Sequence, residues 1–447
     1  MSERQPDQEA GPGLKRILGW PQGVALGGAA VFGTGILLLP GAVAARAGPA
    51  SLLSWIVMAT LGAPLAFVLA HLAAETPGAG GIADYVHRAL GARLGESAGT
   101  VFLGTVPVGG PVAAWIGASY LGPLGVHGPW LFPVAGALCL AAVVLNALGV
   151  ELTGRAALIV VGAIVALLGL AAALGMSHVR ASDFRPFAPH GWVPVGWGVA
   201  VLFWAYVGWE QVGHLAEEFR HPARDIPLAT AFAFLLVSVV YLAVAFVTVG
   251  TGVYRAGGAD VALARLYTLD LGPWAARGAA CVALVVTYGT LHAYVAGFSR
   301  LLYARARRGE LPAALARLSH RGTPTVSLAL MAGTFMVTLT LEAVTGRGVL
   351  SLLTWTSGVF VLLYGLAMLS GIRRFRGVWR LLSGVGLAVC VAAYPFLGWG
   401  MIYPLVLLAL GLVLSRGTVA SGRPREHGMD TARSSSLPGS SVRPPSR

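Results

Sequence analysis

Long apolar stretches recur through almost the whole chain, and they restrict its fold more than any other feature. A helix needs roughly 20 mostly apolar residues to cross the hydrocarbon core of a bilayer. The stretches 51–73 and 324–345 are two clear examples. Of the 447 residues, 56% are apolar and only 11% are charged, whereas an ordinary soluble domain carries about 25% charged residues. We therefore predict an all-α integral membrane protein.

Counting the apolar stretches predicts about twelve transmembrane helices. The expected spans are 22–46, 51–73, 97–121, 129–150, 156–176, 197–217, 227–251, 273–298, 324–345, 350–371, 378–396 and 400–415. We expect a cytoplasmic segment over 1–20 and a transmembrane domain over 21–416. The remaining segment, 417–447, is basic and rich in Ser, Pro and Gly, which predicts a disordered tail.

The basic residues predict the orientation of the chain in the membrane. With the amino terminus inside, the cytoplasmic segments hold 24 lysines and arginines and the outer loops hold 7. By the positive-inside rule both termini are cytoplasmic, in a multi-pass protein of the cell membrane. The net charge of +13 does not indicate a nucleic-acid partner, because no basic face is interleaved with stacking aromatic residues.

The first span carries glycines in its interior. Gly33 and Gly35 flank Thr34 at mid-span, and an interior glycine costs a helix about 1 kcal/mol relative to alanine. One interpretation is a break whose freed backbone amides line a cavity and bind a carboxylate. The other is a close helix contact through small residues, since Gly23 and Gly27 also fit the G-x-x-x-G pattern. The sequence leaves both interpretations open.

The sixth span contains Glu210, a carboxylate placed deep within an apolar stretch. An ionisable group in mid-membrane costs at least about 2.5–3.5 kcal/mol on insertion scales and indicates a functional site by default. The alternative is a structural role, in which the carboxyl group bridges broken helix ends. Gly208 beside it is a second weak point in the helix. Glu342 lies near the end of the ninth span, and we expect it to be solvated.

The two irregular spans begin successive sets of five helices. The sets cover about 22–176 and 197–371, and two further helices follow over 378–415. Inverted repeats whose first helices are discontinuous, and meet at the substrate site, produce this pattern. We therefore expect a core of five plus five helices.

Three motifs resemble the amino acid–polyamine–organocation superfamily. Residues 33–36, followed by 39–41, resemble its first-helix signature, and residues 203–210 resemble its sixth-helix motif. Residues 217–227 are similar to the cytoplasmic loop that follows. The similarity extends over nearly the whole chain, to about Arg416.

Within the superfamily the chain is most similar to the bacterial exporters of methionine and branched-chain amino acids. Residues 77–83, 106–109 and 214–219 carry this narrower resemblance. It implies a LeuT-type fold and a secondary transporter that moves neutral amino acids by alternating access, with efflux as its direction. An importer or an exchanger of the same superfamily is the alternative.

The resemblance also implies roles for residues at the two breaks. The substrate-binding set is Ala30, Gly33, Thr34, Gly35, Ile36, Trp204, Tyr206 and Val207. The amides of the first break and the Thr34 hydroxyl would bind the substrate carboxylate, and carbonyls around Ala30, Trp204 and Val207 would receive the α-ammonium group. Tyr206 would act as an aromatic gate or wall, and Glu210 would tie the two broken helices together.

The coupling ion stays open. Some proton-coupled relatives use a lysine of the fifth helix, but the single lysine here, Lys15, precedes the first span. His292 in the eighth span is the other titratable candidate, because histidine changes charge near neutral pH. The alternative for His292 is a hydrogen-bonded packing residue.

Two other functional classes fit less well. An ATP-driven pump needs a G-x-x-x-x-G-K-[ST] phosphate loop, and Lys15 does not lie in one. A membrane-embedded metalloenzyme needs metal-spaced histidines such as H-E-x-x-H, which the sequence lacks. We expect a transporter and not an enzyme, with an amino acid substrate, no cofactor and no bound metal.

Overall fold

A computed structural model describes residues 18–75, 81–149, 154–210, 216, 219–255, 257, 259–346 and 348–420. Within these ranges the regular structure is helical, apart from one isolated parallel bridge between Leu18 and Phe219. The predicted tail lies outside the described residues from position 421 onward, and so do residues 1–17 of the amino-terminal segment.

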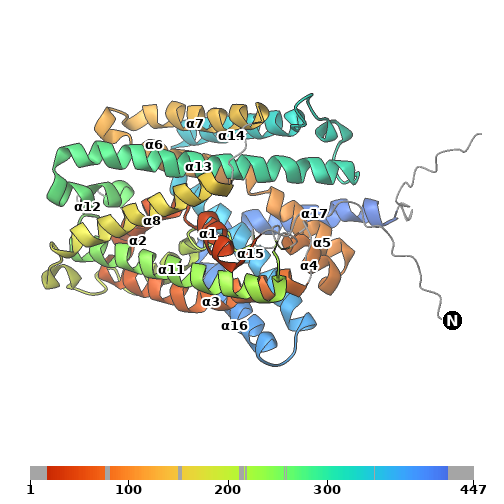
Figure 1. Ribbon diagram of the computed structural model, residues 1–447, viewed down its shortest axis with the longest axis horizontal. Coiled ribbons are helices and arrows are strands. Elements are labelled where there is room, and N and C mark those ends of the chain that lie inside the picture. The colour runs from red at the N-terminus through yellow and green to blue at the C-terminus, as the bar shows by residue number, and fades with distance from the viewer. Residues whose placement is uncertain are drawn as a thin grey trace, which may run out of the picture.

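The helices follow one another closely along the chain (Figure 1). The α-helices are α1 Trp20–Val31, α2 Gly35–Ala47, α3 Ser51–Glu75, α4 Gly81–Leu90, α5 Ala92–Leu103, α6 Val106–Ser119, α7 Leu131–Ala147, α8 Gly154–Met176, α9 Val193–Leu202, α11 Pro222–Gly250, α12 Ala262–Leu271, α13 Pro273–Arg307, α14 Thr325–Thr345, α15 Val349–Arg374, α16 Gly377–Ala393 and α17 Ile402–Ala420. The 3₁₀ turns are η1 Gly48–Ala50, η2 Gly122–Leu124, η3 Gly128–Trp130, η4 Ala181–Phe184, η6 Ala259–Val261, η7 Ala313–Ala316 and η8 Tyr394–Met401.

Eight helical stretches of the described chain are long and apolar enough to cross a membrane. They are Gly35–Glu75, Ala92–Ser119, Gly128–Ala147, Pro222–Gly250, Pro273–Arg307, Thr325–Thr345, Val349–Arg374 and Gly377–Ser415. The first and last of these each contain two α-helices joined by a 3₁₀ turn. The prediction of an all-α membrane protein is therefore confirmed.

The long helices run side by side (Figure 1). Helices α6, α7, α13 and α14 pack together along one edge of the molecule, and α3 packs on α11 at the opposite side. Helix α1 lies between these groups and contacts α8 and α11. Helix α15 is central, because it contacts α3, α6, α9 and α16.

The first span is interrupted at the glycines singled out by the sequence. Helix α1 ends at Val31 and α2 begins at Gly35. Phe32, with φ −69° and ψ 68°, has the dihedral angles of an inverse γ-turn. The matching hydrogen bond runs from the Gly33 amide to the Val31 carbonyl at 2.7 Å. The chain thus leaves one helix and enters the next within three residues.

The sixth span is interrupted after Leu202, where α9 ends. Residues 203–206 and 209–210 form turns, and 207–208 have no regular structure, so the helix does not continue. Gly208 has φ +127°, a backbone conformation that a residue with a side chain rarely adopts. Residues 211–215 lie outside the described part of the chain.

The third span has an interruption that the sequence analysis did not anticipate. Helix α5 ends at Leu103 and α6 begins at Val106. Pro107 has no amide hydrogen to donate to the Leu103 carbonyl, so the helical ladder cannot continue there. Two tyrosine hydroxyls donate to the carbonyls at the break, Tyr403 to Gly104 and Tyr294 to Thr105, each at 2.6 Å.

Helix α2 packs closely against η6 and α12, and its middle residue Gly41 lies at this contact. A Cβ atom placed on Gly41 would overlap the carbonyl oxygen of Ala259 and lie 2.8 Å from the Ala262 Cβ. Backbone cannot move aside as readily as the end of a flexible side chain. This contact therefore requires glycine.

We predict that Gly41→Ala lowers the free energy of unfolding by about 1–3 kcal/mol, because overpacking forces backbone shifts. Gly169→Ala in α8 is the matched control, since its added Cβ would meet nothing within 4 Å. Thermal unfolding of the purified protein in detergent gives the comparison. Equal melting temperatures for the two variants would contradict the close packing of α2 on η6.

Candidate functional site

The two breaks of the first and sixth spans lie against each other. A Cβ atom placed on Gly35 would lie 3.0 Å from Trp204 Cδ1 and 3.1 Å from Ala205 Cα. The start of α2 therefore approaches the backbone of the sixth span more closely than a side chain would allow. The glycine preserves a direct backbone contact between segments that are far apart in the sequence.

Tyr241 of α11 connects the same two breaks by hydrogen bonds. Its hydroxyl lies 2.9 Å from the Val31 carbonyl oxygen and 3.3 Å from the Ala205 carbonyl oxygen. Val31 ends α1, and Ala205 lies in the break of the sixth span. Both carbonyls have left a helical ladder, and burying a carbonyl without a partner is costly in a membrane.

The two breaks contain both partly accessible and buried residues. Gly33, Trp204 and Val207 are each partly accessible, although most of their neighbours in the breaks are buried. Thr34 is only 1% exposed, and its hydroxyl has no hydrogen-bond partner among the described residues. The first amides of α2 point out of the helix start, where an α-helix supplies them with no internal acceptor.

Glu210 is buried, with 4% of its surface exposed. Its Oε2 atom accepts a hydrogen bond from the Tyr364 hydroxyl at 2.7 Å and another from the Gly208 amide at 3.1 Å. Tyr364 belongs to α15, the central helix. The described hydrogen bonds of Glu210 thus join the sixth break to α15, whereas the link to the first break is made by Tyr241.

The remaining residues of the predicted set lie around this contact. The Tyr206 ring is 3% exposed and packs on Phe234 and Tyr241 of α11, with ring centroids 5.8 Å and 5.5 Å away. The Ile36 side chain is fully buried, so only its backbone is available to a ligand. Ala30 lies one residue before the end of α1, and its side chain is outside the described part.

The arrangement suits a zwitterionic ligand. The start of α2 offers amides and a hydroxyl to a negative group, while the broken ends of α1 and α9 offer carbonyl oxygens to a positive group. Both sets come together because the two breaks touch. Among the described residues no group of three or more His, Cys, Asp or Glu is placed to hold a metal ion.

Comparison with known proteins gives the family. The amino acid permease family model matches residues 18–419. The chain belongs to this family. It is 37% identical over 406 residues to the uncharacterized amino acid permease YecA of Bacillus subtilis, covering 90% of this chain and 95% of the relative. The L-methionine/branched-chain amino acid exporter YjeH of Escherichia coli is 32% identical over 402 residues, covering 89% and 95%.

A third relative is more distant. The branched-chain amino acid permease BcaP of Bacillus subtilis is 27% identical over 441 residues, covering 90% of this chain and 92% of the relative. The family match confirms the resemblance to the amino acid–polyamine–organocation superfamily. Together with its apolar helices, it makes this permease a multi-pass membrane protein that transports amino acids rather than an enzyme.

His292 of the permease lies on α13 and is 3% exposed. Its Nδ1 atom is 3.1 Å from the amide nitrogen of Asn146 in α7 and 3.1 Å from the Tyr288 hydroxyl. The Asn146 nitrogen also donates to the carbonyls of Ala142 and His292, which fixes the orientation of its amide. Nδ1 thus has two polar neighbours, Asn146 and Tyr288, and the hydroxyl of Tyr288 can pair with either tautomer of the ring.

His292 faces away from the two breaks. Thr290 is the residue of α13 that approaches them, because a Cβ on Gly33 would lie 3.7 Å from its Cγ2 atom. Two residues of α-helix turn by about 200°, so His292 points to α7 on the opposite side. Its role in coupling stays a prediction, and its described contacts are those of a packing residue.

Glu342 corrects one expectation for the permease. Its position near the end of the ninth span predicts a solvated side chain, whereas Glu342 is only 6% exposed. It lies on α14, three residues before the helix ends at Thr345. Proximity to a helix end did not ensure exposure, because neighbouring helices cover this face.

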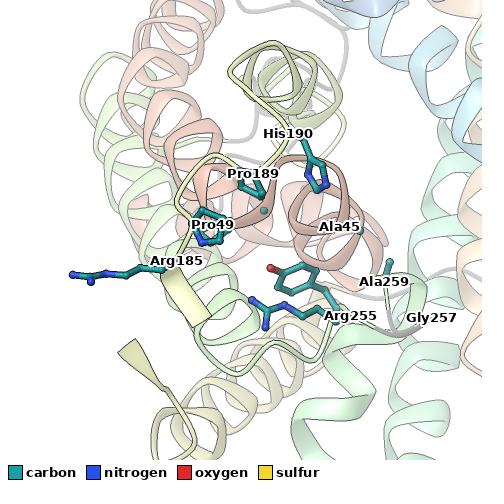
Figure 2. A pocket seen from close by; sticks show the side chains of 11 residues that line it. Ala45, Pro49, Arg185, Pro189, His190, Arg255, Gly257 and Ala259 are labelled. Atoms are coloured by element: carbon teal, nitrogen blue, oxygen red, sulfur yellow. The ribbon is translucent and has the colours of Figure 1, made fainter. Parts of the chain in front are cut away.

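A separate cavity of about 640 Å³ lies at the opposite end of α2 from the break. Figure 2 shows Pro49, Pro189 and His190 around one side of it and Arg255 on another, while the Arg185 side chain points away. Arg255 is paired with Asp183 at 2.7 Å. The cavity contains none of the predicted site residues.

One catalytic-looking motif has a structural explanation. Residues 95–99 read Gly-Glu-Ser-Ala-Gly, which fits the G-x-S-x-G pattern of hydrolases. That pattern needs a sharp turn between a strand and a helix, but these residues lie inside α5. Ser97 is fully buried and donates to the Arg93 carbonyl at 2.6 Å. It is not placed as a nucleophile.

Sequence reasoning missed three residues at the site: Tyr241, Thr290 and Tyr364. Each is a hydroxyl side chain in an apolar span, where a polar group must find a partner. A hydroxyl group within an apolar span therefore indicates a buried hydrogen bond. The indication is weak here, because tyrosine and threonine also pack well in apolar surroundings.

We predict that Tyr364→Phe lowers the free energy of unfolding by about 1–3 kcal/mol, because it removes a donor from the buried Glu210 carboxyl group. Tyr403→Phe, which removes a donor from a neutral carbonyl, is the matched control and should cost about 0.5–1.5 kcal/mol. Thermal unfolding in detergent measures both. A larger loss for Tyr403→Phe would contradict the importance given to the Glu210 contact.

Proposed function

We propose that this permease moves neutral amino acids, methionine and the branched-chain amino acids in particular, by alternating access. The observation that carries the proposal is the contact between the two helix breaks at Gly35 and Trp204. It brings amides and carbonyls together at one place, as the backbone of an α-amino acid requires. The YjeH relative is named as an exporter of these substrates, which supports the substrate class.

The binding mode follows the chemistry of the breaks. The amides of Gly35 and Ile36 and the hydroxyl of Thr34, which has no partner among the described residues, hold the substrate carboxylate at the start of α2, and Gly33, whose amide donates to the Val31 carbonyl, lines the site beside them. Carbonyls near Ala30, Trp204 and Val207 receive the ammonium group. Tyr206 forms a wall of the site. A neutral side chain fits, because the described hydrogen bonds of Glu210 already engage its carboxyl group.

We further propose twelve membrane helices in the predicted order, with inverted repeats over about 22–176 and 197–371. Val161–Met176 of α8 and Val193–Leu202 of α9 are apolar, and α2/α3 and α16/α17 are separate helices, which supports this number. The interruptions in α1/α2 and after α9 fall at the first span of each repeat. The lysines and arginines outnumber those of the outer loops in the segments that are cytoplasmic when the amino terminus is inside, which supports cytoplasmic termini in the cell membrane.

The direction we propose is efflux, from the similarity to the YjeH exporter. Import or exchange is the alternative. The relative BcaP is named a branched-chain amino acid permease rather than an exporter, so transport should be measured in both directions. A proton is the coupling ion we would test first, with His292 and Glu210, two of the buried ionisable residues, as the candidate groups.

We predict that Thr34→Val raises the KM for leucine by roughly threefold to tenfold, because the substrate loses one hydrogen bond. Radiolabelled transport in proteoliposomes measures the change. Thr334→Val on α14 is the matched control, since its hydroxyl bonds only to the Met331 carbonyl. Equal KM values for both variants and the wild type would remove Thr34 from the site.

We predict that Glu210→Gln reduces transport to less than about a tenth of the wild-type rate, while the protein still folds and inserts. The amide matches the carboxyl group in shape and can keep an oxygen toward Tyr364 and Gly208, but it carries no charge and cannot gain or lose a proton. Size-exclusion profiles verify folding. Wild-type rates in this variant would exclude Glu210 from the transport mechanism.

Counterflow tests the proposal as a whole. Proteoliposomes loaded with unlabelled methionine or leucine should take up the radiolabelled amino acid saturably, and a proton gradient should change the rate if a proton is coupled. Uptake must depend on the internal substrate. Folded protein that exchanges no neutral amino acid would contradict the proposed substrate class.

A further inference from the structure

Tyr241 occupies the middle of α11 and is completely buried. Its hydroxyl is within hydrogen-bond distance of a carbonyl of each break, 2.9 Å from that of Val31 and 3.3 Å from that of Ala205. A phenol has one proton to donate. The two carbonyl oxygens therefore converge on a single hydroxyl group, which fixes their separation and their direction.

The Tyr241 ring reinforces the same connection. It packs edge-on against Phe32 of the first break, with centroids 5.6 Å apart, and against Tyr206 of the second break at 5.5 Å. Trp55 of α3 packs edge-on from a third side at 5.6 Å. Such edge-to-face pairs have preferred geometry, so the ring holds the hydroxyl in place.

The Val31 carbonyl has a second donor. The Gly33 amide reaches it at 2.7 Å through the turn at Phe32. The oxygen is therefore fixed by its own chain on one side and by Tyr241 on the other. Each of these carbonyls belongs to a planar peptide unit, so fixing the carbonyls of Val31 and Ala205 also fixes the Cα atoms from which the peptides of Ala30 and Trp204 extend.

We propose that Tyr241 is a positioning residue that sets the array of break carbonyls to the geometry of a primary ammonium group, and so gives the permease its selectivity for unmodified α-amino acids. This inference rests on the proposed function. A primary ammonium group has three N–H donors, and an N-methylated one has two. A fixed array of carbonyls distinguishes the two ligands, whereas a loose array does not.

Other tyrosines of the bundle provide a matched comparison. Tyr294 donates to the Thr105 carbonyl at the break of the third span, at 2.6 Å. It has the same chemistry as Tyr241, namely a phenol that satisfies a carbonyl at a helix break. It differs in bonding to one break only, and that break lies outside the proposed substrate site.

The test compares Tyr241→Phe with Tyr294→Phe in proteoliposomes. Three quantities are measured for each: the KM for leucine, the inhibition constant of N-methylleucine and that of 4-methylpentanoate, which lacks the ammonium group. For Tyr241→Phe we expect the KM for leucine to rise about tenfold. We expect weaker discrimination against N-methylleucine and unchanged inhibition by 4-methylpentanoate. For Tyr294→Phe we expect the KM for leucine and both inhibition constants to stay close to the wild-type values.

Two results would overturn the inference. One is a Tyr241→Phe protein with wild-type KM and wild-type discrimination. The other is the same loss of discrimination in Tyr294→Phe, because it would show a general effect of looser packing. Wild-type protein that transports neither leucine nor methionine would refute the proposed function itself, and this failure is distinct because it appears without any substitution.

A rescue variant covers the case in which Tyr241→Phe does not fold. Tyr241→4-aminophenylalanine keeps the ring and supplies N–H donors at the same position. We expect it to fold and to retain the KM for leucine and the discrimination within about twofold of wild type, because the donor is preserved. A folded rescue variant that has lost discrimination would contradict the positioning role.

Discussion

A helix that breaks inside a bilayer releases backbone groups that water cannot reach, and the rest of this structure depends on how those groups are satisfied. The three described interruptions receive tyrosine hydroxyls from other helices. Tyr241 donates at the first and sixth spans, and Tyr294 and Tyr403 donate at the third. Each phenol keeps an apolar ring in the packed bundle and delivers one donor to a freed carbonyl. The carbonyls of the breaks are thus stabilised, while the amides at the start of α2 are left for a ligand.

The breaks also need close approach, which glycine provides. Gly35 allows the start of α2 to touch the backbone of the sixth span, and Gly41 allows the middle of α2 to meet η6. Helix α2 is thereby held at its start and at its middle by contacts that no side chain separates. A substrate bound at its start is in contact with a helix whose position is shared between the two repeats proposed here.

The sequence predicted the class of fold and the position of two breaks for physical reasons that are easy to state. Long apolar stretches leave only membrane helices, and glycines around Thr34 and beside Glu210 mark the places where those helices weaken. The third break has an equally physical signal in Pro107, but proline is common near helix starts and does not by itself indicate a break in mid-span.

Tertiary partners could not be predicted in the same way. Nothing local distinguishes Tyr241 from a packing tyrosine, because its importance comes from two carbonyls supplied by distant segments. The burial of Glu342 likewise depends on neighbouring helices and not on its place along α14. Sequence patterns indicate where a helix is interrupted. The side chains that donate hydrogen bonds to the freed carbonyls come from distant segments, so they are identified only in the packed structure.

A structure of the permease with bound leucine or methionine tests the central claim most directly. The account predicts ligand density between residues 33–36 and 204–207, with the carboxylate at the start of α2 and the ammonium group beside the carbonyls that Tyr241 orders. Density in the cavity beside Arg255, with the two breaks unchanged and without ligand, would contradict it.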